Sequence, residues 1–138
     1  MKGKDILICQ NKRAYHDYNV LDTMEAGIEL FGTEIKSLRN NHATFNDAYC
    51  EIKNGEVFVK GFHIAQYEMG NIFNHDPDRK KKLLLHKKEI VKLTTKKTQD
   101  GYTIIPIKVY LKEGLAKMEI GICKGKKLYD KRENLKKE

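Results

Sequence analysis

The segment GYTIIPIKVYLKEGLAKMEIGI, residues 101–122, contains two runs in which apolar and other side chains alternate. Alternation with a period of two is typical of a β-strand, so we predict a strand on each side of the turn at Lys112-Glu113-Gly114. Pro106 has no backbone N–H to donate, which predicts an edge position or a β-bulge there. In the first strand, the residues expected on one face are Thr103, Ile105, Ile107, Val109 and Leu111.

Further strands are predicted upstream of this hairpin. The segment 24–30 alternates in the same way, and the segments 48–53 and 56–60 flank Asn54-Gly55, the dipeptide favoured in type I′ hairpin turns. Short helices are predicted near residues 12–18 and 33–39, and a longer helix before the last hairpin. The predicted fold class is therefore mainly β with about three external helices. We predict a six-stranded antiparallel OB-like Greek-key barrel, because closure hides the sheet edges. A ferredoxin-like or other layered α+β sheet is the alternative.

The size and cysteine content of the chain favour one cytoplasmic domain. A length of 138 residues is typical of a single domain, spanning 1–138 here. There is no apolar run of membrane-spanning length, and three widely spaced cysteines without a CxxC pair suit a reducing compartment. We expect residues 1–10 to form a loosely ordered leader and residues 125–138 to form a basic, mobile end.

The segment RKKKLLLHKKEIVKLTTKK, residues 79–97, makes the chain basic, because it holds nine Lys or Arg and a single acid, Glu89. Helical spacing of Leu83, His86, Ile90 and Leu93 after the Asp76-Pro77 turn predicts a helix with its lysines outward. Basic clusters bind polyanions by releasing counterions, so nucleic acid is the expected partner. The alternative is that these lysines only solvate a helix face.

Smaller signals also point to RNA. The segment NKRAYHDY, residues 11–18, interleaves charges with rings, a composition suited to phosphates and exposed bases. Glu25, on the polar face of a predicted strand, is either simply solvent-exposed or accepts hydrogen bonds from a base or a sugar hydroxyl. The histidines and cysteines show neither metal-ligand nor nucleophile spacing, so we expect no metal, no cofactor and no catalysis. A generic OB-fold RNA binder and an RNA-processing enzyme remain the alternative functions.

Seven ordered blocks of the sequence resemble the SmpB family of SsrA-binding proteins, over residues 11–137. The blocks are Asn11-Lys12-Arg13 with His16-Asp17-Tyr18, Glu25-Ala26-Gly27-Ile28, the segment 32–39 (GTEIKSLR), Asp47-Ala48-Tyr49, His75-Asp76-Pro77 with Arg79 and the segment 82–87 (KLLLHK), the segment 101–106 (GYTIIP), and Glu119-Ile120-Gly121-Ile122 with the segment 124–132 (KGKKLYDKR).

The resemblance implies an OB-like barrel that acts in trans-translation without making or breaking a bond. Members of the family bind the tRNA-like domain of transfer-messenger RNA. They accompany it, charged with alanine and carried by elongation factor Tu, into the empty A site of a stalled ribosome. The incomplete peptide is then tagged for proteolysis. The implied partners are therefore transfer-messenger RNA and the decoding centre of the small ribosomal subunit.

The resemblance also implies site residues. Glu25, Leu84 and Lys117 occupy positions of the family's RNA-binding surface, although a leucine in a Leu-Leu-Leu run is commonly core. The family meets the decoding centre with residues matching Lys124, Gly125, Lys126, Lys127, Tyr129, Lys131 and Arg132. To the RNA-binding set we add, from charge and composition, Lys12, Arg13, His16, Lys36, Arg39, Arg79, Lys81 and Lys82. His16 and Tyr18 either contact RNA or pack a helix onto the barrel.

The family continues past the block that ends at Arg132 with a further basic tail, whereas this sequence stops at Glu138. We therefore expect a chain of this length to bind RNA but to fail in accommodation on the ribosome.

Overall fold

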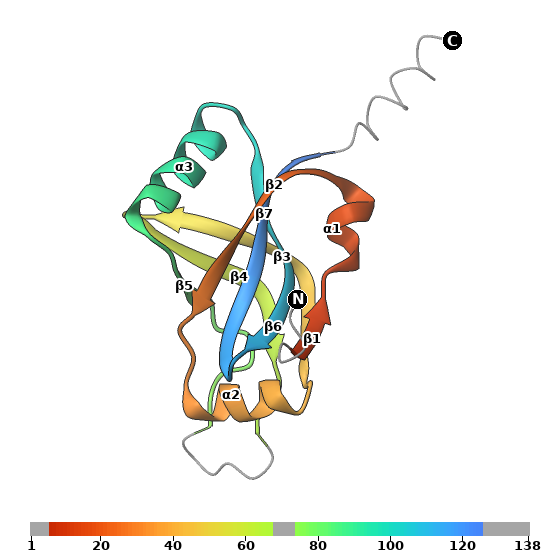
Figure 1. The fold of residues 1–138 in the computed structure, drawn as a ribbon. Coiled ribbons are helices and arrows are strands. Elements are labelled where there is room, and N and C mark those ends of the chain that lie inside the picture. Colours follow the sequence, from red (N-terminus) through yellow and green to blue (C-terminus); the bar gives the residue numbers. More distant parts are fainter. Residues whose placement is uncertain (1–5, 68–73, 126–138) are drawn as a thin grey trace, which may run out of the picture.

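The computed structural model describes residues 6–67 and 74–125, which form one antiparallel sheet and three helices (Figure 1). The seven strands follow the spatial order β1-β6-β7-β2-β5-β4-β3. Their bounds are β1 Ile6–Gln10, β2 Tyr18–Ile28, β3 Ala43–Lys53, β4 Glu56–Ile64, β5 Lys81–Leu84, β6 Thr103–Lys112 and β7 Leu115–Gly125.

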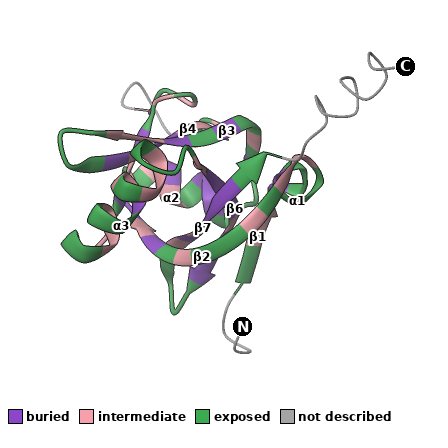
Figure 2. Ribbon diagram, turned by 90° about the horizontal axis from the view of Figure 1, so that it is seen from above, coloured by how far each residue is buried: buried purple, intermediate pink, exposed green. Residues whose placement is uncertain are grey.

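The sheet curves into a nearly closed barrel, because its two end strands, β1 and β3, lie against each other. Viewed from above in Figure 2, the strands surround a centre where buried residues gather. The core includes Phe62, Ile64, Leu83 and Met118, all fully buried. The predicted mainly β barrel with three external helices is confirmed. It has seven strands rather than six. Two of them were not predicted: residues 6–10, expected to belong to a loose leader, form β1 on β6, and residues 81–84, expected to begin a helix, form β5.

Three helices lie outside the barrel: α1 Lys12–Asp17, α2 Gly32–Arg39 and α3 Lys87–Thr98. In Figure 1, α2 covers the lower end of the barrel, while α1 and α3 lie on opposite sides of its upper end. Asn11 precedes α1 but does not cap it; its side-chain amide donates to the Pro106 carbonyl at 2.9 Å and ties α1 to β6. Within residues 6–67 and 74–125, no helix combines the length and apolar character that a membrane crossing requires.

A β-bulge divides β6 into two halves. The register with β7 shifts between Pro106 and Lys108, as predicted for a proline in this strand. Beyond the bulge Val109 belongs to the barrel core, whereas Ile105 and Ile107 pack in a second cluster against α1. The prediction that all alternate residues from Thr103 to Leu111 share one face is therefore wrong, because one extra residue reverses the alternation.

The basic segment does not begin as a helix. Residues 81–84 form β5, in which Leu84 pairs with Gly27 of β2 and Leu83 pairs with both β2 and β4. The helix begins only after His86, whose backbone N–H donates to the Glu89 carboxylate at 2.9 Å, half of a capping box. The helical spacing of Leu83 was coincidental, since pairing with two neighbouring strands determines its conformation.

The β3–β4 hairpin confirms the predicted turn and contains a second irregularity. Asn54 and Gly55 have φ angles of 54° and 76°, the positive values that a type I′ turn requires. The register then shifts between Phe45 and Tyr49, where Gly61 lies opposite the extra residues with a φ of +79°. A Cβ at Gly61 would lie 2.5 Å from the Asn46 carbonyl oxygen.

Replacing Gly61 by alanine is expected to lower the free energy of unfolding by about 2–3 kcal/mol, because the new Cβ meets rigid backbone at a strained φ. Urea unfolding of the variant beside Gly55→Ala measures this loss. Gly55 also has a positive φ, but a Cβ there meets no atom within 4 Å, so its variant should lose less. Equal losses in the two variants would show that backbone strain alone, and not the close approach at the bulge, makes glycine necessary.

Candidate nucleic-acid interface

Strand register brings three residues of the predicted RNA-binding set together on the outer face of the sheet. Tyr110, Lys117, Gly27 and Leu84 form one row across β6, β7, β2 and β5, since each is the register partner of the next. Glu25 lies in the neighbouring outer row. These rows border a cavity of about 640 Å³, here called the β2–β5 groove, which is lined by Met24, Glu25, Gly27, Leu84, Leu85, His86, Glu89 and Lys117.

Leu84 lies on the surface of this groove and not in the core. Its side chain is 50% exposed, whereas its neighbour Leu83 is 1% exposed. The two differ because successive strand residues point to opposite faces. Gly27 lets β5 approach here, since a Cβ at that position would lie 3.3 Å from the Cβ of Leu84. Leu84 therefore presents an apolar surface in the groove.

Glu25 is held as a carboxylate at the edge of the groove. The Tyr110 hydroxyl donates a hydrogen bond to Glu25 Oε1, and Lys112 Nζ lies 3.5 Å from the same oxygen. The hydrogen bond from Tyr110 is the main cause that lowers the pKa of Glu25, and the charges of Lys112 and Lys117 lower it further. Glu25 is therefore ionised at neutral pH and acts only as an acceptor.

The groove combines three kinds of contact that a nucleotide needs. Chemically, the Glu25 carboxylate can accept hydrogen bonds from N–H or hydroxyl groups, Leu84 can make apolar contacts, and the Lys117 ammonium can pair with an anion such as a phosphate. Lys87 and Lys88 follow the groove residue His86 at the start of α3, are exposed, and form no ion pair with any described residue. These two cations extend the positive charge beside the groove.

Most other cations of the basic segment are neutralised by acids from elsewhere in the chain. The expectation of an unbalanced positive surface is therefore wrong for them, although local sequence contains only Glu89 as an acid. The pairs and their N–O distances are Arg79–Glu34 at 2.7 Å, Lys80–Glu51 at 3.8 Å, Lys82–Glu56 at 2.9 Å, Lys92–Asp22 at 2.7 Å and Lys96–Asp100 at 3.5 Å.

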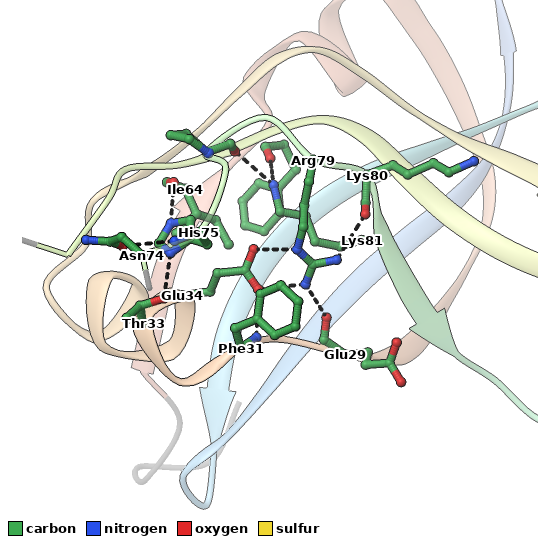
Figure 3. A network of polar contacts seen from close by, with 12 residues as sticks. Glu29, Phe31, Thr33, Glu34, Ile64, Asn74, His75, Arg79, Lys80 and Lys81 are labelled. Carbon is green, nitrogen blue, oxygen red and sulfur yellow. Dashed lines mark hydrogen bonds and ion pairs between the residues drawn. The ribbon is translucent and has the colours of Figure 1, made fainter. Parts of the chain in front are cut away.

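Arg79 is the centre of a structural network (Figure 3). Its guanidinium donates to both oxygens of the fully buried Glu34 carboxylate, at 2.9 and 2.7 Å, and to the Glu29 carbonyl at 3.2 Å. It also stacks over the Phe31 ring, 4.3 Å from the centroid. The two parallel hydrogen bonds from one guanidinium to one carboxylate hold Arg79 in a fixed orientation. Arg79 therefore links α2, which carries Glu34, to the segment that leads into β5.

Lys81 is the clearest departure from the predicted surface. Its side chain is completely buried, so the expectation that it faces outward is wrong. Its ammonium donates to the carbonyl of Phe62 and, at 3.0 Å, to that of Pro77. Burial lowers the pKa of Lys81 to about 8, which the nearby Glu34 carboxylate opposes only in part. An amine enclosed in this way cannot reach a phosphate.

Lys81 is expected to make the protein relatively more stable as pH rises from about 8 to about 10.5. In this range the unfolded chain binds the proton and the folded chain does not, so the free energy of unfolding rises with pH. Other groups titrate there too, so the measured quantity is the difference between wild type and Lys81→Met, obtained from urea unfolding at several pH values. A pH-independent difference would contradict a lowered pKa.

The remaining predicted contacts lie away from the groove. Lys12, Arg13 and His16 are on α1, which leads into the start of β2, where Tyr18 pairs with Gly125 and Asn19 with Lys124. Asn19 and Glu25 are six residues apart on β2, roughly 20 Å at about 3.3 Å per residue. Arg13 is ion-paired to Asp17 and Asp47, and His16 lies 2.7 Å from Asp17.

Lys36 and Arg39 are exposed on α2, at the lower end of the barrel in Figure 1. Lys124 and Gly125 end β7 and are exposed. The other residues predicted to meet the decoding centre lie outside the described residues: Lys126, Lys127, Tyr129, Lys131 and Arg132. The structure thus separates the predicted contacts into the groove, the α1 end of β2, and α2.

Sequence reasoning did not assign a role to Gly27, which lets β5 approach β2, or to Tyr110 and Lys112, which contact Glu25 at the edge of the groove. Tyr110 and Lys112 carry a signal, since they alternate with the core residues of β6. Their proximity to Glu25 depends on the order and register of β6, β7 and β2, which the sequence does not reveal. Among the described residues, no group of three or more His, Cys, Asp or Glu side chains could hold a metal ion.

Comparison with known proteins assigns the chain to a family. The family described as SmpB protein matches residues 8–138. The SsrA-binding protein of Enterococcus hirae is 57% identical over 136 residues, covering 99% of this chain and 88% of that protein. The SsrA-binding protein of Thermosipho africanus is 58% identical over 132 residues, covering 95% and 89%.

A solved structure has the same fold. One chain of the structure described as "tmRNA-SmpB: a journey to the center of the bacterial ribosome" superposes with a TM-score of 0.73 at 46% identity, covering 89% of this chain and 87% of that one. The match of the family over nearly the whole chain, the close relatives and the shared barrel agree with one another. The chain belongs to the SmpB family.

Proposed function

We propose that this protein binds the tRNA-like domain of transfer-messenger RNA and delivers it to the A site of stalled ribosomes for trans-translation. Its partners would be transfer-messenger RNA, the small-subunit decoding centre and, through the alanine-charged RNA, elongation factor Tu. The role is one of binding rather than catalysis. It would be carried out in the cytoplasm, where ribosomes translate.

The observation that carries this proposal is the meeting of Glu25, Leu84 and Lys117 in the β2–β5 groove. These three residues come from β2, β5 and β7, so only the folded barrel brings them together. An acceptor, an apolar surface and a cation form a site for a structured RNA better than a uniform positive surface does, because phosphate contacts alone carry no sequence information. The relatives named SsrA-binding proteins support the choice of this RNA.

A second surface supports contact with the ribosome. Lys12 and Lys124 are exposed at the α1 end of β2, roughly 20 Å from the groove by the length of that strand. A separation of this size would allow the groove to hold the tRNA-like domain while the α1 end faces another RNA. We propose that Lys12, Arg13, His16, Lys124 and Gly125 belong to this ribosome-facing surface.

Competition binding tests the proposed function. The affinity for the isolated tRNA-like domain is measured across a salt series, with an elongator tRNA and a plain RNA duplex as competitors. All three affinities should fall with salt, because phosphate contacts contribute to each. The tRNA-like domain should keep its advantage at every salt concentration. Equal binding of the three RNAs would favour a generic RNA-binding barrel, and chemical turnover of any of them would favour an RNA-processing enzyme.

A further inference from the structure

The hydrogen bond between Tyr110 and Glu25 joins strands that are not neighbours in the sheet. Tyr110 is on β6 and Glu25 is on β2, with β7 between them. Tyr110 is 6% exposed, yet it lies between Val109 and Leu111, which face the core, so its ring belongs to the outer face. The ring is covered while its hydroxyl reaches the edge of the groove.

The contacts that Tyr110 and Lys112 make with the Glu25 carboxylate go to the same oxygen. The hydroxyl of Tyr110 and Nζ of Lys112 each approach Glu25 Oε1. Within the described part of the chain, this arrangement leaves Oε2 as the oxygen available to an incoming donor. The Glu25 side chain is 37% exposed and would otherwise sample several rotamers. Because the buried Tyr110 already fixes this acceptor, binding of a ligand costs less side-chain rotamer entropy.

We propose that Tyr110 is a positioning residue that fixes the Glu25 carboxylate so that the groove selects nucleotides presenting N–H or 2′-hydroxyl donors. The inference rests on the proposed function and adds to it the source of the groove's selectivity. A fixed carboxylate repels phosphate and attracts donors, so it favours base and ribose edges over backbone. Lys117, beside it in the next row, supplies the phosphate contact that Glu25 cannot.

This role differs from that of a residue that only maintains the barrel. If Tyr110 acts through Glu25, removal of its hydroxyl should matter only while the carboxylate is present. If Tyr110 merely packs, the same substitution should have the same effect in either background. A double-mutant cycle separates the two roles, because residues that act through one another are not additive.

The test uses the full chain and the isolated tRNA-like domain. Tyr110→Phe is expected to reduce the affinity by about five- to tenfold in the wild-type background and by less than about twofold in the Glu25→Ala background. The slope of affinity against salt should not change, since neither residue neutralises a phosphate. Tyr102→Phe, which removes a hydroxyl before β6 and away from the groove, is the matched control and should bind like wild type.

The pKa of Glu25, measured by carboxyl NMR titration, gives a second readout, which would not change if Tyr110 only packed against its neighbours. In Tyr110→Phe the pKa of Glu25 should rise toward its ordinary value, because the lost hydrogen bond is the main cause of its lowering. An unchanged pKa, or an equal loss of affinity in both backgrounds, would overturn the role of Tyr110 and leave the proposed function standing. Failure of the wild-type protein to prefer the tRNA-like domain would overturn both.

Discussion

Replacing Arg79 by methionine is expected to lower the free energy of unfolding by about 3–5 kcal/mol. The substitution keeps most of the apolar stem but leaves the fully buried Glu34 carboxylate without its two charge-assisted hydrogen bonds. A buried charge that has lost its partner costs far more than an exposed one. The loss is measured by urea unfolding at neutral pH.

Lys82→Met is the matched control, because it removes a cation from the same basic segment. Its partner Glu56 is exposed, so the loss should be about 0–1 kcal/mol. Arg79→Lys should recover only part of the stability, since an ammonium cannot donate to both carboxylate oxygens in the same fork. A loss below about 1 kcal/mol for Arg79→Met would show that the network in Figure 3 contributes little, and that Arg79 is free for another role.

Replacing Leu84 by aspartate is expected to weaken binding of the tRNA-like domain by about 100-fold, an effect typical of a residue at the centre of an interface. The substitution removes the apolar contact and adds a negative charge beside the phosphates. The free energy of unfolding should change little, because half of this side chain is exposed. Fluorescence anisotropy with a labelled RNA measures the affinity.

Leu21→Asp controls for the charge that this substitution adds. Leu21 is on β2, is 52% exposed, much like Leu84, and does not line the groove. Its variant should lose only the small affinity expected from one unit of general repulsion. Similar losses for the two variants would mean that overall charge, and not the groove, determines binding.

Local rules predicted the elements that depend on neighbouring residues alone. The Asn54-Gly55 turn and the alternating strands around residues 103–122 follow from φ preferences and from a period of two, so the barrel class could be predicted. The conformation at the start of the basic segment could not be predicted in this way. Leu83 fits a helical pattern with Leu93, but β5 forms because strands β2 and β4 lie on both sides of it.

The candidate site shows the same division. The chemistry of Glu25 and Lys117 could be named from the sequence and from family resemblance, whereas their meeting required the register of three strands. Charge was the least reliable guide. Lys81, Arg79 and Lys87 are equivalent cations of the same basic segment when only the sequence is considered. In the structure, Lys81 donates to two backbone carbonyls in the interior and Arg79 pairs with the distant Glu34. Ion pairing between distant segments is invisible to local counts of charge.

The most direct test of the β2–β5 groove as the RNA site is an NMR map of backbone amide and leucine methyl shifts as the tRNA-like domain is added. The largest changes should fall on Gly27, Leu84 and Lys117, with smaller ones at the start of α3. Changes confined to α1 and the end of β7 at Lys124 would contradict the groove as the site and assign binding to the opposite end of β2.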